Sequence, residues 1–322
     1  KGISTMSNPT ASDVHIDAAL SDLAIAWGSQ QYVWDQLAPV VDVPKQSDKY
    51  HIFTLDDFRR DEIPGPRAEK TLAERGEYGL SNDSFYCDDW AWGKSTSKEA
   101  KKNADAALNL EQADLRYCLG VVNRRIELQW VSEVFTTSVW DTDITGASSV
   151  STNQVIYWST EATSEPIQDV RAQADAIQKA TGERPNRLAM GREVLTVLLD
   201  HPDIVDRLPV NAIREVMLKH LAALFEVDEI IVGVASYNSA KKGATVSNSF
   251  IWGKNALLYY VPSSPSKDVP SALYSFRWGP RSVLNYEDTP AGKMADVIEV
   301  HDYVDVKVTA SELGVFFSGI VE

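Results

Sequence analysis

The feature that most limits the fold of this chain is a long amphipathic helix pattern that begins after Asn109, a suitable helix cap. The apolar positions, spaced by three and four residues, are Leu115, Leu119, Val122, Ile126, Trp130 and Val134. This spacing places them on one helix face, and Glu111 and Asp114 stand in the first turns, where carboxylates favour the positive helix end. The pattern continues to about Trp140, which predicts a helix of ~30 residues and ~45 Å. A helix of this length is expected to serve as a frame for the elements around it.

The sequence before this helix predicts two extended parts. In residues 1–48, Pro39 and Pro44 flank a valine-rich stretch, which favours an extended arm over a helix. Lys49–Phe58 and Ser84–Thr96 are strand-like, and a long polar connection rich in Gly and Pro separates them. We therefore predict a long hairpin that projects from the body.

The sequence after the helix predicts an α/β lobe followed by more strands. The expected elements are helices at Ile167–Ala180, Arg192–Leu199 and Ala212–Phe225, and strands at Arg187–Met190, Ile230–Val234 and Ser249–Val261. Pro166 and Gly182 are the start and stop signals of the first helix. Residues 281–322 are strand-like, with clear alternation from Val304 to Val308, and we expect these strands to pack against the long helix.

Motifs of catalytic or metal chemistry are not found in the sequence. The five histidines form no HExxH or other ligand pattern, and there is no GxSxG and no phosphate-binding loop. Cys87 and Cys118 are far apart, with no CxxC. We expect no catalytic residue, no metal and no cofactor. The carboxylate pairs Asp56-Asp57, Asp61-Glu62, Asp88-Asp89 and Glu287-Asp288 leave a cytosolic hydrolase as an alternative, although neighbouring residues in a strand point to opposite faces.

Charge and hydropathy limit the partners of this chain. The net charge of -15 argues against affinity for nucleic-acid phosphates, but an acidic wall can enclose DNA without binding it. The first residues lack the apolar run of a signal peptide, and no stretch of about 18 apolar residues is present. We therefore expect a cytosolic protein with no membrane partner.

Three segments carry a resemblance to a known family. Phe225–Gly243, Ile251–Pro262 and Phe276–Gly279 resemble segments of major capsid proteins of tailed bacteriophages. The order of elements along the chain is also similar to the Hong Kong 97-type capsid fold, an α+β fold with an N-terminal arm, an extended β-hairpin loop, a long spine helix, a peripheral lobe and an axial α/β lobe.

The resemblance implies four parts and a structural role. The arm covers residues 1–48, the extended loop 49–97, the peripheral lobe 98–165 and 278–322, and the axial lobe 166–277. Subunits of this family form hexamers and pentamers that close into icosahedral shells around double-stranded DNA, with scaffolding, portal and decoration proteins as possible partners. Such a chain would be assembled in the host cytoplasm and located in the virion capsid. An encapsulin-type nanocompartment, which encloses an enzyme, shares the fold and stays open as an alternative.

Large aromatic side chains are frequent anchors of protein interfaces. On the predicted projecting loop these residues are Phe85, Tyr86, Trp90 and Trp92. We predict that they contact a neighbouring subunit.

Overall fold

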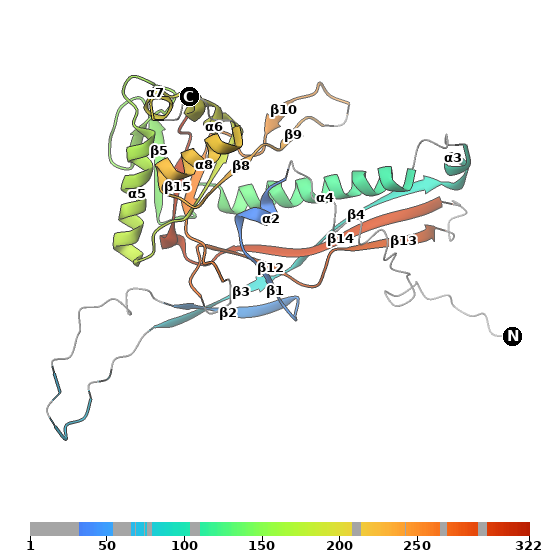
Figure 1. Cartoon of the computed structure of the whole chain (residues 1–322). Coiled ribbons are helices and arrows are strands. Elements are labelled where there is room, and N and C mark those ends of the chain that lie inside the picture. Colours follow the sequence, from blue (N-terminus) through green and yellow to red (C-terminus); the bar gives the residue numbers. More distant parts are fainter. Residues whose placement is uncertain are drawn as a thin grey trace.

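The computed structural model describes residues 32–53, 66–67, 69–73, 75, 79–103, 110–207, 214–241, 243–264, 269–288 and 295–322. Two β-sheets, a long helix, several shorter helices and two projecting ribbons make up this part of the chain (Figure 1). The predicted strand end at Phe58, the predicted helix cap Asn109 and the predicted helix start at Ala212 lie outside the described residues.

The first sheet has five strands built around β14 (Ala295–Val308). Its other strands are β1 (Val40–Asp42), β4 (Asp88–Ser97), β12 (Leu273–Arg277) and β13 (Ser282–Asp288). One side of β14 pairs with β13 and then β12, both antiparallel, and its other side pairs with β4 along ten residues. β1 adds in parallel to β12. Alternation along β14 puts Ile298, Val300, Val304 and Val306 on one buried face, so the strand-like C-terminal sequence forms the centre of this sheet.

The long helix α4 (Leu110–Val134) lies over that buried face (Figure 1). All six apolar positions predicted for its inner face are buried, which confirms the helix and its orientation. The predicted end at Trp140 is wrong, because α4 stops at Val134. The reason is local: Ser138 adopts a positive φ of 67°, and the Trp140 indole folds back to donate a hydrogen bond to the Val134 carbonyl at 2.8 Å. α4 is therefore 25 residues long, or about 38 Å.

The second sheet has six strands in the order β6-β5-β15-β11-β7-β8. The strands are β5 (Thr142–Ala147), β6 (Gln154–Ile156), β7 (Arg187–Gly191), β8 (Glu229–Gly233), β11 (Ala256–Tyr259) and β15 (Gly314–Ser318). The helices packed on it are α5 (Pro166–Thr181), α6 (Arg192–Asp200), α7 (Pro202–Val205) and α8 (Arg214–Phe225). The predicted helix that ends before Gly182 is confirmed, since Gly182 adopts the left-handed conformation with φ 88° and its N–H bonds the Gln178 carbonyl.

Each sheet mixes ranges that are distant in the sequence. β5, β6 and β15 share a sheet with the strands of the range 166–277, whereas β12, from within that range, joins the sheet of β14. The chain therefore passes several times between the two sheets, and η2 (Ser311–Leu313) links β14 to β15.

Two strands that the sequence predicts as continuous are interrupted, which corrects those predictions. The stretch from Ser84 to Thr96 is split at Cys87 into β3 (Leu80–Tyr86) and β4, because β3 pairs with β2 (Ser47–Phe53) while β4 pairs with β14. The stretch from Ser249 to Val261 is split into β10 (Asn248–Phe250) and β11, because Gly253 turns the chain with a positive φ of 57°.

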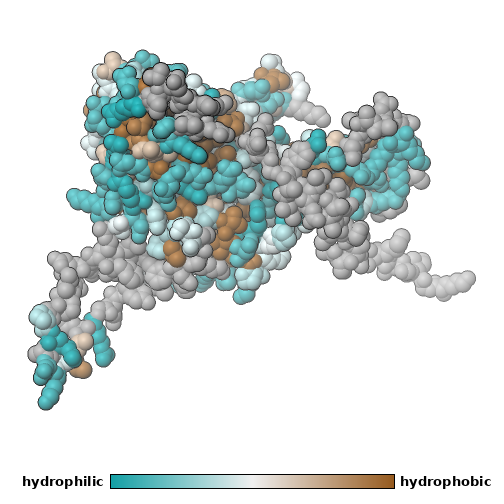
Figure 2. Space-filling view, viewed as in Figure 1, coloured by the Kyte–Doolittle hydropathy of each residue, from teal (hydrophilic) through white to brown (hydrophobic). Residues whose placement is uncertain are grey.

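Two antiparallel ribbons stand out from the body (Figure 1). The first consists of β2 and β3, and its base is held by a small core in which Phe85, Tyr50 and Phe276 pack together. The second consists of β9 (Ser236–Asn238) and β10. Figure 2 shows an apolar patch on the second ribbon, where Val246 is 65% and Phe250 40% exposed.

Candidate subunit-contact surface

Strand β4 forms one edge of the five-stranded sheet. It pairs with β14 on one side, and no other strand of the described ranges pairs with its opposite side. Most of its residues are exposed. An exposed edge of ten residues presents backbone N–H and C=O groups to any approaching chain, so β4 is a candidate contact element.

The four predicted contact residues lie in different environments. Phe85 is only 1% exposed and stacks on Phe276, with 4.3 Å between the ring centroids, so its side chain packs within its own chain. Trp90 is half-buried, and its indole donates a hydrogen bond to the Val304 carbonyl at 3.3 Å. Tyr86 and Trp92 are 56% and 45% exposed. Tyr86 and Trp92 thus keep the surface that a neighbour can cover.

Trp92 lies between two open hollows. The first, of about 280 Å³, lies between β4 and α4, and its lining includes Arg124, Arg125 and Leu128. The second, of about 460 Å³, includes Tyr286 in its lining. The first hollow combines apolar and cationic side chains, and the second combines aromatic side chains with the carboxylates of Asp288 and Glu299. Open surfaces of this mixed character suit a protein contact better than a small ligand.

The sequence interpretation missed further exposed aromatic residues near this surface. Trp278 is 37% exposed, just after β12, and Tyr286 is 36% exposed on β13, where its hydroxyl donates to a Glu299 oxygen at 2.6 Å. Trp278 stands within Phe276–Gly279, one of the three family-like segments. Its exposure depends on the turn between β12 and β13, which sequence spacing does not reveal.

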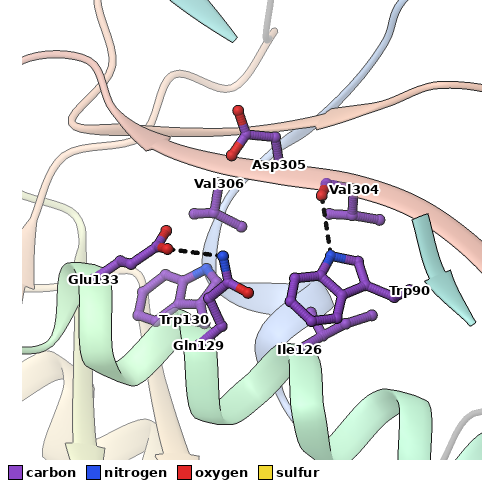
Figure 3. A pocket seen from close by; sticks show the side chains of 8 residues that line it. All are labelled: Trp90, Ile126, Gln129, Trp130, Glu133, Val304, Asp305 and Val306. Carbon is purple, nitrogen blue, oxygen red and sulfur yellow. Dashed lines mark hydrogen bonds between the residues drawn. The ribbon is translucent and has the colours of Figure 1, made fainter. Parts of the chain in front are cut away.

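A small cavity lies between α4 and β14, beside Trp90 of β4 (Figure 3). Its lining residues are Trp90, Ile126, Gln129, Trp130, Glu133, Val304, Asp305 and Val306. Its volume is about 10 Å³, which admits one water molecule at most. Gln129 donates to Glu133 at 2.7 Å across its rim. The cavity therefore has no room for a substrate.

Ser164 and His201 form a buried pair that superficially resembles a catalytic dyad. The Ser164 oxygen lies 2.9 Å from His201 Nε2, but the Asp203 N–H donates to His201 Nδ1 at 3.2 Å. Nδ1 is therefore the acceptor, and Nε2 carries the proton and donates to Ser164, whose own hydroxyl donates to the Thr160 carbonyl. A ring nitrogen that already holds a proton cannot activate the serine as a general base.

In each carboxylate pair within the described ranges, one member has a structural partner. Asp89 contacts the imidazole of His301 at 3.0 Å, and Glu287 pairs with Lys98. Asp56-Asp57 and Asp61-Glu62 lie outside the described residues. Across the ranges that the structure describes, no cluster of three or more His, Cys, Asp or Glu side chains is placed to hold a metal. Burial raises the pKa of both free thiols, Cys87 and Cys118, to about 11.

None of the described helices combines the length and the apolar character needed to cross a bilayer.

Comparisons with known proteins agree with this architecture. No family model matches the chain. It is 26% identical over 254 residues to the major capsid protein of Burkholderia phage BcepMu, covering 77% of this chain and 76% of that protein. It is 25% identical over 316 residues to the major capsid protein of Pseudomonas phage JBD67, covering 95% of this chain and 97% of that protein.

Solved structures with the same fold cover nearly the whole chain. A phage-related protein from Bordetella bronchiseptica superposes with a TM-score of 0.70 at 21% identity, covering 95% of this chain and 98% of that chain. The mature capsid of bacteriophage PhiM1 superposes with a TM-score of 0.55 at 11% identity, covering 91% and 88%. The virus-like particle from Pyrococcus furiosus superposes with a TM-score of 0.54 at 13% identity, covering 93% and 96%.

The chain therefore has the α+β Hong Kong 97-type capsid fold, as the order of its elements predicted. Its sequence similarity to phage major capsid proteins extends over almost its full length, which confirms the resemblance seen in the three segments.

Proposed function

We propose that this chain is a structural major capsid protein, which self-assembles through hexamers and pentamers into an icosahedral shell enclosing double-stranded DNA. The observation that carries the proposal is the capsid fold along the chain, combined with relatives that are major capsid proteins of phages. Neither the nanocompartment nor the hydrolase alternative has comparable support, because the sequence relatives are phage capsid proteins.

The proposed division of labour follows the four predicted parts. Residues 1–48 act as an arm, 49–97 as an extended loop, 98–165 with 278–322 as the peripheral lobe, and 166–277 as the axial lobe. The two lobes exchange strands, because β5, β6 and β15 complete the sheet of the axial range and β12 joins the sheet of β14. The exposed Tyr86 and Trp92 beside the open edge of β4 supply contact area to a neighbour. Phe85 and Trp90 support the same surface from beneath, through Phe276 and Val304.

The interior of the shell is proposed to hold DNA without binding a particular sequence. The net charge of -15 disfavours tight contact with phosphates. Scaffolding, portal and decoration proteins are proposed partners, and assembly in the host cytoplasm would precede incorporation into the virion capsid. The role requires no catalytic residue, metal or cofactor from this chain.

The first test is size-exclusion chromatography combined with negative-stain electron microscopy of the purified protein. Polyhedral shells, or rings of five or six subunits, are expected. A monomer at every concentration, with or without co-expression of the scaffolding protein of its own gene cluster, would contradict the proposal. Assembled particles from infected cells are then treated with nuclease, and protected double-stranded DNA is expected inside; a protected enzyme in its place would support a nanocompartment.

A further inference from the structure

Residues 32–38 fill a groove between α4 and the two sheets, which is called the cradle below. In this segment the short helix α2 (Trp34–Leu37) is preceded by Val33 and followed by Ala38. The side chains of Val33, Trp34, Leu37 and Ala38 are all less than 10% exposed and belong to the core around α4. The segment is therefore buried in the body of the molecule.

Polar groups from three other elements hold the backbone of this segment. At its start, the Val33 N–H donates to the Glu127 carboxyl of α4 at 2.8 Å. At its end, an Arg187 guanidinium N–H from β7 donates to the Gln36 carbonyl at 2.8 Å, and the Tyr259 hydroxyl from β11 donates to the Leu37 carbonyl at 2.8 Å. These contacts satisfy backbone groups that a one-turn helix leaves free, and they place an acidic group at its start and a basic one at its end.

Glu127 connects this segment to the second sheet. Its side chain is completely buried, and its other oxygen accepts a hydrogen bond from the Trp252 indole at 2.7 Å. Trp252 belongs to the turn that leads into β11, and its ring packs against Phe135 with 4.7 Å between centroids. A single carboxyl group thus joins the segment 32–38, α4 and the start of β11.

We propose that Glu127 is a pH-sensitive pin, which holds residues 32–38 in the cradle when it is neutral and releases them more readily when it is ionised. A protonated carboxyl keeps acceptor capacity on its oxygens, so the hydrogen bonds from Val33 and Trp252 are compatible with the neutral form. The charged form has to stay buried, without a solvent shell, for as long as the segment covers it. Residues 32–38 belong to no strand, so their release leaves the pairing of Val40–Asp42 with β12 in place.

The surroundings of the Glu127 carboxyl decide whether docking of residues 32–38 strengthens or weakens as the pH rises. Burial raises the pKa of Glu127 to about 7 from its ordinary 4.5, against the opposing effect of the N–H donors from Trp252, Val33 and Trp34. Asp35 on α2 raises it further. Arg124 on α4 acts on Tyr32, which is also coupled to Glu127. Two more cations face the segment: Arg187 at the Gln36 carbonyl, and Arg277, whose guanidinium lies 5.7 Å from the centre of the Trp34 ring.

Because the docked pKa is raised, docking is fully favoured below pH 4.5 and weakens as the pH rises through about 7. Between pH 6 and pH 8 the docking equilibrium is expected to fall about tenfold. Docking itself is a property of the single chain. Any consequence of docking for contacts between subunits rests on the proposed shell function.

Amide hydrogen exchange of the intact soluble protein tests the pin. Protection factors, corrected for the intrinsic effect of pH, are measured between pH 5 and pH 8 for peptides covering residues 32–38, β7 and β11. In the native protein, protection of 32–38 is expected to fall about tenfold from pH 6 to pH 8, while β7 and β11 stay protected. Constant protection of 32–38, or an equal loss in all three regions, would overturn the proposal.

Two variants and a control make the test specific. Glu127→Gln removes the titration, so the protection of 32–38 becomes independent of pH. Trp252→Phe removes a donor that favours the ionised form, so the transition moves to higher pH, which keeps the proposal testable if the first variant does not fold. Glu133→Gln, an exposed carboxyl on the same helix, is expected to behave as the native protein.

An unchanged pH dependence in Glu127→Gln, or no displacement of the transition in Trp252→Phe, would contradict the pin. Shell formation is followed separately by microscopy. A failure of the shell proposal is therefore distinguishable from a failure of the pin.

Discussion

A buried ion pair between β14 and the start of β13 allows a sharp prediction about what fixes α4 to its sheet. Asp302 is fully buried, and one of its oxygens accepts hydrogen bonds from Arg281 at 2.9 and 2.7 Å. The same guanidinium donates to the Asn123 side chain on α4 at 2.9 Å. Asp302 therefore orients the side chain that ties the helix to the sheet.

The expected magnitude follows from what each substitution leaves behind. Asp302→Ala leaves the Arg281 guanidinium without its carboxylate, although the Arg281 side chain is only 13% exposed. Removal of one partner of a buried ion pair costs ~3–5 kcal/mol. Asp302→Asn keeps an acceptor but loses the charge, and the loss of a charged hydrogen bond costs about 1.5–3 kcal/mol. The matched control is Asp175→Ala, which removes the 69% exposed partner of Arg184 and is expected to cost about 0–1 kcal/mol.

The assay is urea unfolding of the purified protein at pH 7, followed by tryptophan fluorescence. The change in unfolding free energy is the shift in midpoint multiplied by the common denaturant slope. The order Asp302→Ala, Asp302→Asn, Asp175→Ala, from most to least destabilised, is expected. If Asp302→Ala costs no more than Asp175→Ala, the ion pair does not hold α4 in place and the reasoning is refuted.

Three further predictions concern contacts, packing and thiols. Trp92→Ala is expected to reduce shell formation, which microscopy measures. Because the Trp92 side chain is 45% exposed, the monomer is expected to lose less than ~1 kcal/mol of stability. Shells that form normally would exclude Trp92 as a subunit contact. Gly233→Ala introduces a Cβ that overlaps the buried Trp252 indole and is expected to cost ~1–3 kcal/mol of unfolding free energy. Gly120→Ala on α4 meets open space and is expected to stabilise the fold by ~0.5–1 kcal/mol. Urea unfolding of both variants measures the difference. Cys87 and Cys118, with thiol pKa values of about 11 caused by burial, are expected to resist a thiol reagent at pH 8 until urea is added, and rapid labelling of the native protein would contradict this.

Local periodicity predicted the elements whose pattern lies within one stretch of sequence. α4, α5 and α6 each repeat apolar residues on a single face, and the start and stop signals of α5 were read correctly from Pro166 and Gly182. The end of α4 was missed because it depends on the Trp140 indole folding back onto the Val134 carbonyl. That contact is a tertiary event which spacing does not encode.

The contact surface was harder to predict for a related reason. Phe85 and Trp92 appear in one aromatic stretch, yet Phe85 faces a small core and Trp92 faces solvent. The difference arises at Cys87, where the chain leaves β2 as a partner and joins β14. The choice of partner strand is set by residues more than 200 positions away, so sequence alternation alone assigns neither side chain to the surface.

The buried face of α4 carries three polar side chains among its apolar ones, and these decide how the helix is positioned. Asp114 accepts from Thr96 on β4, Asn123 accepts from Arg281, and Glu127 accepts from Trp252. Apolar packing alone tolerates a helix that slides, because the hydrophobic effect has no direction. A slide of one turn, about 5.4 Å, would leave all three polar groups buried without partners, at ~1–3 kcal/mol each. The three contacts come from three separate parts of the chain, so together they fix one position of α4 against both sheets. The proposed shell of many copies requires subunits of uniform shape, and this polar register on the longest helix of the described chain favours one shape.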